Sequence, residues 1–353
     1  MKKFYRTIIY TKTPLKSQFR YKDKFQILPI DTENAPSSPY NKHFPIFLEY
    51  YIEFDKNENP KNIDFFEDLT AQQVVEFEII NLLSVLSNHR FFKYNYNNHQ
   101  WAVVTPNAGF ESLKEKEKEL FDNQYSSWTI GVYRYPGLAK DLIIENFSEK
   151  KFKDTPLISP YYKYFTENPI ESEQKEITFP ETINSSLENY YKLSKKTYKK
   201  VKSAISLICD GIDISDYKRS LAFLSFTSAI EALVSLEHSD KEIKFECPHC
   251  KRIEESPYNC PKCGKPIWGI KAKFKEFLKK FVAGSDESAE KYNKIYNIRS
   301  KITHQGQLFI SDYEFSLDNL EKKENDYIMK LETLQLARLS LTNWLRYEGK
   351  ASR

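Results

Sequence analysis

Four cysteines have the type and spacing to bind a metal ion. Cys247, Cys250, Cys260 and Cys263 form two Cys-x2-Cys pairs separated by nine residues. A short turn between paired cysteines aims both thiolates at one tetrahedral ion, which is the geometry of structural zinc sites. Because the protein itself fills all four positions, we expect one structural Zn²⁺ per chain and no catalytic metal.

A second candidate group is the pair Arg299 and His304 in the stretch YNIRSKITHQG. Metal-free cleavage of RNA needs a base that works near pH 7, which imidazole supplies, and a cation that holds the phosphate, for which a guanidinium is suited. One histidine cannot easily be both base and acid, so a two-fold axis that joins two copies would complete the site. The spacing alone is common by chance, and a helix end with a basic tip is the competing interpretation.

The C-terminal half of the chain reads as a bundle of four or five helices that would position these residues. The fourth helix opens near Ser285 and stops near His304, with Gly306 as its left-handed cap, and Tyr292, Ile295, Ile298 and Ile302 line its apolar face. The other predicted helices run from Ile183 to Gly211, over 215–237, over 268–282 and over 320–347.

Two surfaces of this bundle can each be interpreted in two ways. A polar seam on the helix over 215–237 contains Ser220, Thr227, Ser228, Glu231 and Ser235. Either the seam faces solvent, or Glu231 supports a site. The lysines on the first helix of the bundle could contact phosphates, although a solvated helix face is the simpler interpretation.

The N-terminal half mixes strand and helix signals and predicts an α+β domain. The segments 7–12, 47–54 and 128–135 are rich in β-branched and aromatic residues, and Thr70 with Gln73 reads as a capping box that opens a helix. The segment 91–104 predicts a hairpin, whose aromatic residues could stack on bases or simply form a half-buried face. A proline-rich stretch over 155–182 marks either a domain boundary or a linker that runs over the surface.

Composition limits the remaining classes. The net charge is +4, which is too small to indicate a nucleic-acid partner by itself. The N-terminus does not read as a signal peptide, so we expect a cytoplasmic protein. The most apolar run, 221–236, is short and contains Glu231 and several hydroxyl residues, so we expect no membrane span.

The segments AFLSFTSAIEALVSL and KIYNIRSKITHQG together resemble the two signature helices of HEPN domains, in particular the ApeA-like branch. The resemblance covers roughly residues 183–347. It implies that Arg299 and His304 are the catalytic pair, that Ser300 fills the polar position after the arginine, and that Glu231 matches the acidic position of the earlier helix. Gln305 departs from the pattern, since many relatives have glycine directly after the histidine.

The resemblance also implies the organisation and the activity. The fold would be an α+β N-terminal domain over 1–180, then an all-α HEPN-type helical bundle over 181–350 with a zinc ribbon inserted at 245–266. Members of the family commonly form homodimers and act as metal-independent ribonucleases in anti-phage defence, abortive infection and toxin systems. RNA, with tRNA as one candidate, would be the substrate, and the N-terminal domain would sense a trigger, such as a phage-derived one, or restrain the nuclease.

Two other functions remain open from the sequence. The first is a HEPN bundle without nuclease activity, which would bind nucleic acid or a partner protein through the ribbon and the lysine face. The second is a DNA-reading regulator, but no recognition helix accompanies the ribbon.

Overall fold

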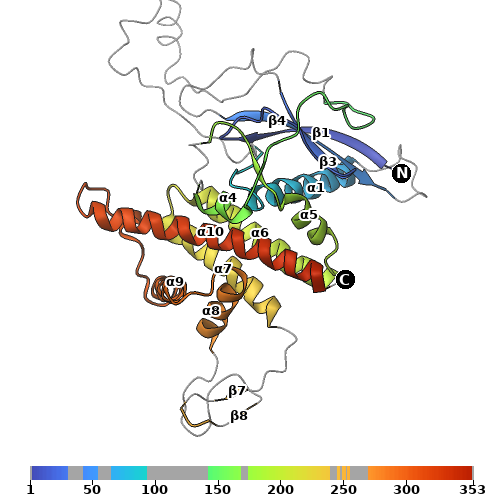
Figure 1. Cartoon of the computed structure of the whole chain (residues 1–353). Helices are drawn as coiled ribbons and strands as arrows, with labels where there is room; N and C mark the ends of the chain where they lie inside the picture. The colour runs from blue at the N-terminus through green and yellow to red at the C-terminus, as the bar shows by residue number, and fades with distance from the viewer. Residues whose placement is uncertain are drawn as a thin grey trace, which may run out of the picture. The chain divides into compact units, whose positions relative to one another are not determined.

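A computed structural model describes residues 2–30, 43–54, 65–93, 142–167, 174–238, 245–246, 249–251, 253–254 and 269–351. The chain divides into two compact units (Figure 1). The first unit comprises Met1–Ile63 and Phe92–Lys153, and the second comprises Asp64–Phe91 and Asp154–Arg353. This division differs from the predicted boundary near residue 180, because the first long helix and the segment after Lys153 group with the helices.

The first unit contains an antiparallel sheet with the strand order β1-β4-β3-β2. The strands are β1 (Lys2–Thr11), β2 (Phe19–Tyr21), β3 (Phe25–Pro29) and β4 (Phe44–Glu53). Strands β1 and β4 pair along their whole length, from Lys2 opposite Glu53 to Thr11 opposite Phe44. The two predicted strands that fall in the described residues, over 7–12 and 47–54, are thereby confirmed.

Strand β4 also carries a buried polar network. The Glu49 carboxylate is fully buried and accepts hydrogen bonds from Arg6 Nη2 at 2.6 Å, from Gln26 Nε2 at 2.6 Å and from Ser148 N at 2.8 Å. A buried carboxylate is tolerated when a cation and several donors surround it. Glu49 therefore holds the segment around Ser148 onto the sheet.

The structure contradicts one further prediction for the N-terminal half, and two others fall on residues that it does not describe. The capping-box prediction is wrong, because helix α1 (Phe65–Val85) begins before Thr70 and the Thr70 hydroxyl donates back to Phe66 O at 2.7 Å. The predicted strand over 128–135 and all of the predicted hairpin beyond Lys93 lie outside the described residues. Phe92 forms a single antiparallel bridge with Tyr10.

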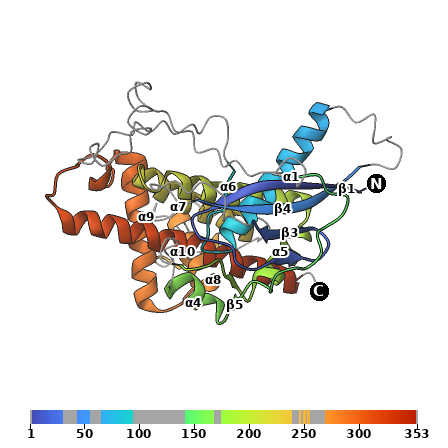
Figure 2. The same ribbon diagram turned by 90° about the horizontal axis from the view of Figure 1, so that it is seen from above.

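The second unit is mostly helical. Helix α7 (Arg219–Glu237) is the centre of the bundle, as Figures 1 and 2 show. It packs against α6 (Lys195–Ile214), α8 (Ile270–Phe281), α9 (Asp286–Gln305) and α10 (Leu320–Ala351). Two short strands, β5 (Leu157–Ile158) and β6 (Phe179–Pro180), pair in parallel. The remaining elements of this unit are α4 (Tyr161–Glu167), α5 (Ile183–Tyr191) and the 3-10 turn η3 (Ile310–Asp312).

The predicted long helix over 183–211 is wrong in two respects. It is broken between α5 and α6, because Ser194 takes an extended conformation and its side chain accepts a hydrogen bond from Thr197 N as the N-cap of α6. Gly211 does not end α6, which continues to Ile214. A Cβ at Gly211 would lie 2.5 Å from Phe226, so this glycine lets α6 and α7 approach closely.

Helix α7 is long and apolar enough to cross a membrane by length and composition, contrary to the prediction from its polar residues. Half of that stretch is buried inside the structure, as in the central helix of a bundle. The length and composition of α7 are therefore only a weak indication of a membrane span.

Candidate active site

Helix α9 carries the candidate pair and has the predicted ends. Ser285 is the N-cap and accepts a hydrogen bond from Ser288 N at 3.2 Å, and Gly306 is left-handed at φ 66° and donates to Lys301 O. Asp286 and Glu287 lie in the first turn, where the helix dipole favours negative charge. The residues that α9 buries are Ala289, Tyr292, Ile295 and Ile302.

Arg299 is held by Glu231, which lies on the neighbouring helix α7. Arg299 Nη2 donates to Glu231 Oε2 at 3.0 Å. The Arg299 side chain is 21% exposed and the Glu231 side chain 20%. Arg299 Nε and Glu231 Oε1 are buried and have no hydrogen-bond partner among the described residues. The ion pair therefore fixes the guanidinium at the edge of the bundle and leaves hydrogen-bonding capacity on both partners.

Tyr296 lies one turn before Arg299 and borders the same site. The guanidinium carbon of Arg299 is 6.0 Å from the centre of the Tyr296 ring, within the range of a cation–π contact. Burial raises the pKa of the Tyr296 hydroxyl, and the negative charge of Glu231 raises that pKa further. Tyr296 therefore stays neutral near pH 7.

The structure does not bring Arg299 and His304 together within one chain. Helix α9 stays regular as far as Gln305, so five residues separate the two side chains by about 140° around the helix. His304 is exposed in the last turn and makes no hydrogen bond or ion pair with the part of the chain that the structure describes. Ser300 is half-buried beside Arg299. A site that uses both side chains on one phosphate needs a second copy of the chain.

The outer face of α9 forms a shallow groove. It is lined by Glu290, Asn293, Lys294, Asn297, Ile298 and Lys301 and has a volume of about 470 Å³. Ile298 was predicted on the buried face, but it is only half-buried and lines this groove. Within the predicted apolar stripe of α9, Ile298 is less buried than Tyr292, Ile295 and Ile302 and lies at the edge of the groove.

The polar seam of α7 does not form one continuous surface. The Ser220 hydroxyl accepts from Phe309 N at 2.7 Å, the Thr227 hydroxyl donates to Phe223 O at 3.1 Å, and the Ser235 hydroxyl donates to Ala232 O at 2.8 Å. These three hydroxyls satisfy backbone groups. Glu231 is the seam residue that reaches the candidate site.

Cys250, the second cysteine of the predicted zinc ribbon, lies between two short paired strands. Strands β7 (Phe245–Glu246) and β8 (Ile253–Glu254) pair antiparallel, so the chain turns back on itself between them. Cys250 lies half-buried in this turn, and Lys251 after it is left-handed at φ 60°. Cys247, Cys260 and Cys263 lie outside the described residues. The structure thus describes one of the four predicted ligands, and a set of four thiolates suits Zn²⁺.

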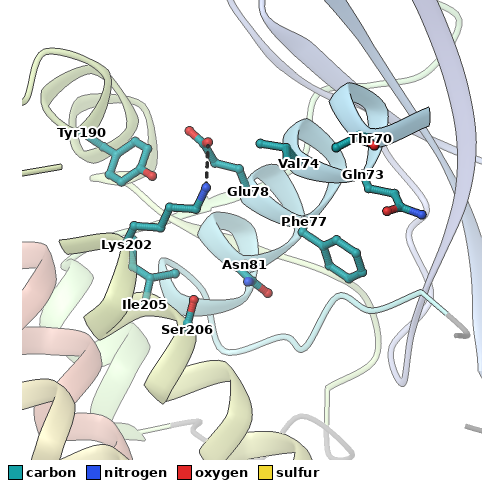
Figure 3. Close-up of a pocket in the computed structure, with 10 residues that line it drawn as sticks. All are labelled: Thr70, Gln73, Val74, Phe77, Glu78, Asn81, Tyr190, Lys202, Ile205 and Ser206. Carbon is teal, nitrogen blue, oxygen red and sulfur yellow. Dashed lines mark ion pairs between the residues drawn. The ribbon is translucent and has the colours of Figure 1, made fainter. Parts of the chain in front are cut away.

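A second hollow, of about 320 Å³, lies between α1 and α6 (Figure 3). Glu78 projects into it from α1, accepts a hydrogen bond from Tyr198 Oη at 2.6 Å and lies 3.8 Å from Lys202 Nζ. Burial and then Glu78 raise the pKa of Tyr198 to about 12. The sequence alone does not predict this hollow, because only the fold brings α1 next to α6. Lys202, assigned to the lysine face, lines it.

Comparison of the chain with protein-family models, with curated proteins and with solved structures found no match.

Proposed function

We propose that the chain is a metal-independent RNA endonuclease of anti-phage defence, whose active site combines Arg299 and His304 from two copies of a HEPN-type bundle. The observation that carries the proposal is the ion pair between Arg299 and Glu231. The two residues lie on α9 and α7, the helices whose sequences resemble the HEPN signature, and the resemblance assigned both of them to one site.

Each side chain has a role that its chemistry allows. The neutral imidazole of one His304 takes the proton of a ribose 2′-hydroxyl, and the 2′-oxygen attacks the adjacent phosphorus. The bond from phosphorus to the 5′-oxygen breaks, and the protonated His304 of the second copy gives that oxygen its proton. The products are a 2′,3′-cyclic phosphate and a 5′-hydroxyl. The guanidinium of Arg299 stabilises the charge that develops on the phosphate oxygens.

Glu231 and Ser300 are positioning residues in this scheme. Glu231 occupies one edge of the Arg299 guanidinium, which restricts the directions in which the remaining N–H groups can donate. Ser300 follows Arg299 on the helix and lies half-buried beside the pair.

The proposed substrate is a structured cytoplasmic RNA such as a tRNA. The zinc ion, held by Cys247, Cys250, Cys260 and Cys263, has a structural role in the ribbon. The N-terminal unit would sense a trigger from phage or restrain the nuclease.

The test uses purified full-length protein and total RNA. Wild-type protein should produce new 5′-hydroxyl ends in the presence of EDTA, since no catalytic metal takes part. His304→Ala and Arg299→Ala should each abolish cleavage, and the control Gln307→Ala, at an exposed position just beyond the helix, should not. Undiminished cleavage by either variant, or cleavage that requires added Mg²⁺, rejects the proposal.

A second candidate function is a non-catalytic module that binds RNA or a partner protein. The regular end of α9 favours it, because Arg299 and His304 diverge within one chain. This function predicts salt-sensitive RNA binding with no new RNA ends. Sequencing the RNA ends after incubation separates the two functions.

A further inference from the structure

A cluster of large apolar side chains stands in solvent directly before helix α10. We call the segment from Asp312 to Glu324, which ends in the first turns of α10, the apolar arm. Tyr313 is 62% exposed, Phe315 91%, Leu317 84% and Leu320 61%. Single exposed apolar residues are ordinary, but a contiguous group of this size marks an interaction surface. In both views the arm lies at the end of α10 opposite the labelled C-terminus (Figures 1 and 2).

The base of the arm is fixed to the bundle. Asp312 accepts hydrogen bonds from Arg219 N and Ser220 N, each at 2.7 Å, and so caps the N-terminus of α7. Phe309 is buried, and its ring packs against Phe223 at 5.3 Å between ring centres. The arm is therefore held in place at its start.

The tip of the arm is folded by its own polar groups. The Glu314 carboxylate accepts hydrogen bonds from Asn319 Nδ2 at 3.1 Å and from Ser316 Oγ at 3.0 Å, and the ammonium of Lys323 donates to Ser316 O. The hydrogen bonds from Asn319 and Ser316 lower the pKa of Glu314. Because these polar groups satisfy one another, the tip presents Phe315 and Leu317 outward.

The charge of the arm restricts what can bind it. Between Asp312 and Glu324 the chain has five acidic residues and two lysines. Such a segment repels the phosphates of nucleic acids and of anionic membranes. The carboxylates of Asp318, Glu321 and Glu324 make no ion pair within the described residues. The arm thus suits a protein surface that is apolar and basic.

The groove on α9 is a surface of this kind on the same chain. It contains the half-buried Ile298 between Lys294 and Lys301, with Glu290 at one end, so two lysines face one carboxylate and the net charge of the groove is positive. Neither lysine forms an ion pair in the described part of the chain. The arm does not fill the groove of its own chain, since Phe315 and Leu317 are almost fully exposed. Both surfaces are left open in a single copy.

We infer that the apolar arm of one chain docks onto the α9 groove of a second copy, and that the second copy does the same in return. Such a reciprocal contact is the form that a two-fold interface takes. The inference deepens the proposed function and rests on it for one consequence. Because Tyr313 follows His304 by nine residues, the exchange would bring the two C-terminal ends of α9 near each other.

Charge reversal tests the pairing of the two surfaces. The arm variant is Asp318→Lys with Glu321→Lys, and the groove variant is Lys294→Glu with Lys301→Glu. Sedimentation equilibrium should show a dimer for the wild type, and each variant alone should raise the dimer Kd at least about 10-fold. An equimolar mixture should recover a Kd within about 3-fold of the wild type, because the reversed arm then faces the reversed groove. A mixture as weak as its components overturns the inference.

Removal of the apolar side chains tests the arm directly. Phe315→Ser with Leu317→Ser should raise the dimer Kd at least about 100-fold, because both contacts occur twice in a reciprocal interface. The control Phe65→Ser removes a phenyl ring that is 70% exposed on α1 and should leave the Kd unchanged. A wild-type chain that stays monomeric, or an arm variant that dimerises like the wild type, overturns the inference.

The outcomes for the arm and for the nuclease are separable. His304→Ala should dimerise like the wild type. A dimer that depends on the arm but does not cleave RNA rejects the proposed function and keeps the interface. A nuclease whose dimer is indifferent to the arm rejects the interface and keeps the proposed function.

Discussion

Arg299 Nη2 donates to Glu231 Oε2 at 3.0 Å, although the two residues are 68 positions apart in the chain. Both side chains are about one-fifth exposed, so the pair is partly removed from water. Loss of either partner leaves a desolvated charge behind, and this cost exceeds the gain from an exposed ion pair. The contact therefore joins α7 to α9 and orients the guanidinium.

The first prediction concerns the strength of this ion pair. Glu231→Gln and Arg299→Gln should each lower the free energy of unfolding by about 1–3 kcal/mol, because each leaves a partly buried group without its charged partner. The double variant should lose less than the sum, with a coupling energy of about 0.5–3 kcal/mol. Urea unfolding of the four proteins measures this cycle.

The matched control is the exposed ion pair between Lys192 and Glu188, whose charged atoms lie 2.6 Å apart at the C-terminal end of α5. Its coupling energy should not exceed about 0.5 kcal/mol. Equal coupling energies for the two pairs would show that the contact between α7 and α9 is an ordinary surface ion pair.

Local sequence signals predicted the ends of α9 but not its long-range partner. Ser285 and Gly306 act through their own backbone and nearest neighbours, so their cap roles can be read from a short window. The contact of Arg299 with Glu231 depends on how α7 packs on α9, and only the family resemblance placed the two residues in one site. The apolar spacing on α9 likewise could not show that Ile298 is only half-buried and lines a groove.

At the break between α5 and α6, the sequence pattern predicted a continuous helix that the structure does not have. The apolar residues of 183–208 recur at intervals of three and four residues, which predicts one continuous helix. Ser194 interrupts it, because its side chain caps Thr197 N and its backbone is extended. A serine within an apolar stripe can continue a helix or start one, and the pattern of its neighbours does not decide between the two.

The second prediction concerns the zinc site. Elemental analysis of the purified protein should find one Zn²⁺ per chain. The double variant Cys250→Ser with Cys260→Ser should contain none, because each Cys-x2-Cys pair then lacks one thiolate. Cys209→Ala is the matched control. Cys209 is buried in α6, and burial raises the pKa of its thiol to about 12, so it is no thiolate ligand near pH 7.

Zinc in full amount in the double variant, or its loss in Cys209→Ala, would contradict the assignment of the four ligands. Circular dichroism should show the helical content unchanged in both variants, since Cys250 and Cys260 lie between α7 and α8 in the sequence and Cys209→Ala keeps a good helix former in α6.

The third prediction concerns the stability of the chain in mild acid. His89 is fully buried, and its Nε2 accepts a hydrogen bond from Thr178 N at 3.2 Å. Burial and then the positive charge of Arg338 lower its pKa to about 3, whereas an unfolded histidine titrates near 6.5. Between these values the unfolded chain binds one more proton, so stability falls as pH falls below about 6.5.

The expected slope from His89 approaches about 1.4 kcal/mol per pH unit. His89→Gln keeps a side-chain acceptor but cannot titrate, so its free energy of unfolding should change less between pH 6.5 and 5 than that of the wild type. Urea unfolding at several pH values in this range gives both slopes. Identical slopes would mean that His89 is protonated in the folded chain or is not buried.

The fourth prediction concerns the close approach of α6 and α7 at Gly211. In the middle of a helix, alanine normally stabilises relative to glycine by about 1 kcal/mol. Here a Cβ would lie 2.5 Å from Cε1 of Phe226, whose ring is fully buried and cannot move freely. Gly211→Ala should therefore lower the free energy of unfolding by about 1–3 kcal/mol, because overpacking outweighs the helix propensity.

A compensating variant separates this clash from other causes. Phe226→Leu removes the ring atoms that the new methyl group would meet, so Gly211→Ala should cost less in the Phe226→Leu background than in the wild type. Chemical denaturation of the two single variants and the double variant gives the comparison. If Gly211→Ala stabilises the wild-type chain, α6 and α7 do not pack at the distance that the glycine permits. The predicted loss, relieved by Phe226→Leu, would establish that Gly211 serves the packing of the central helix that carries Glu231.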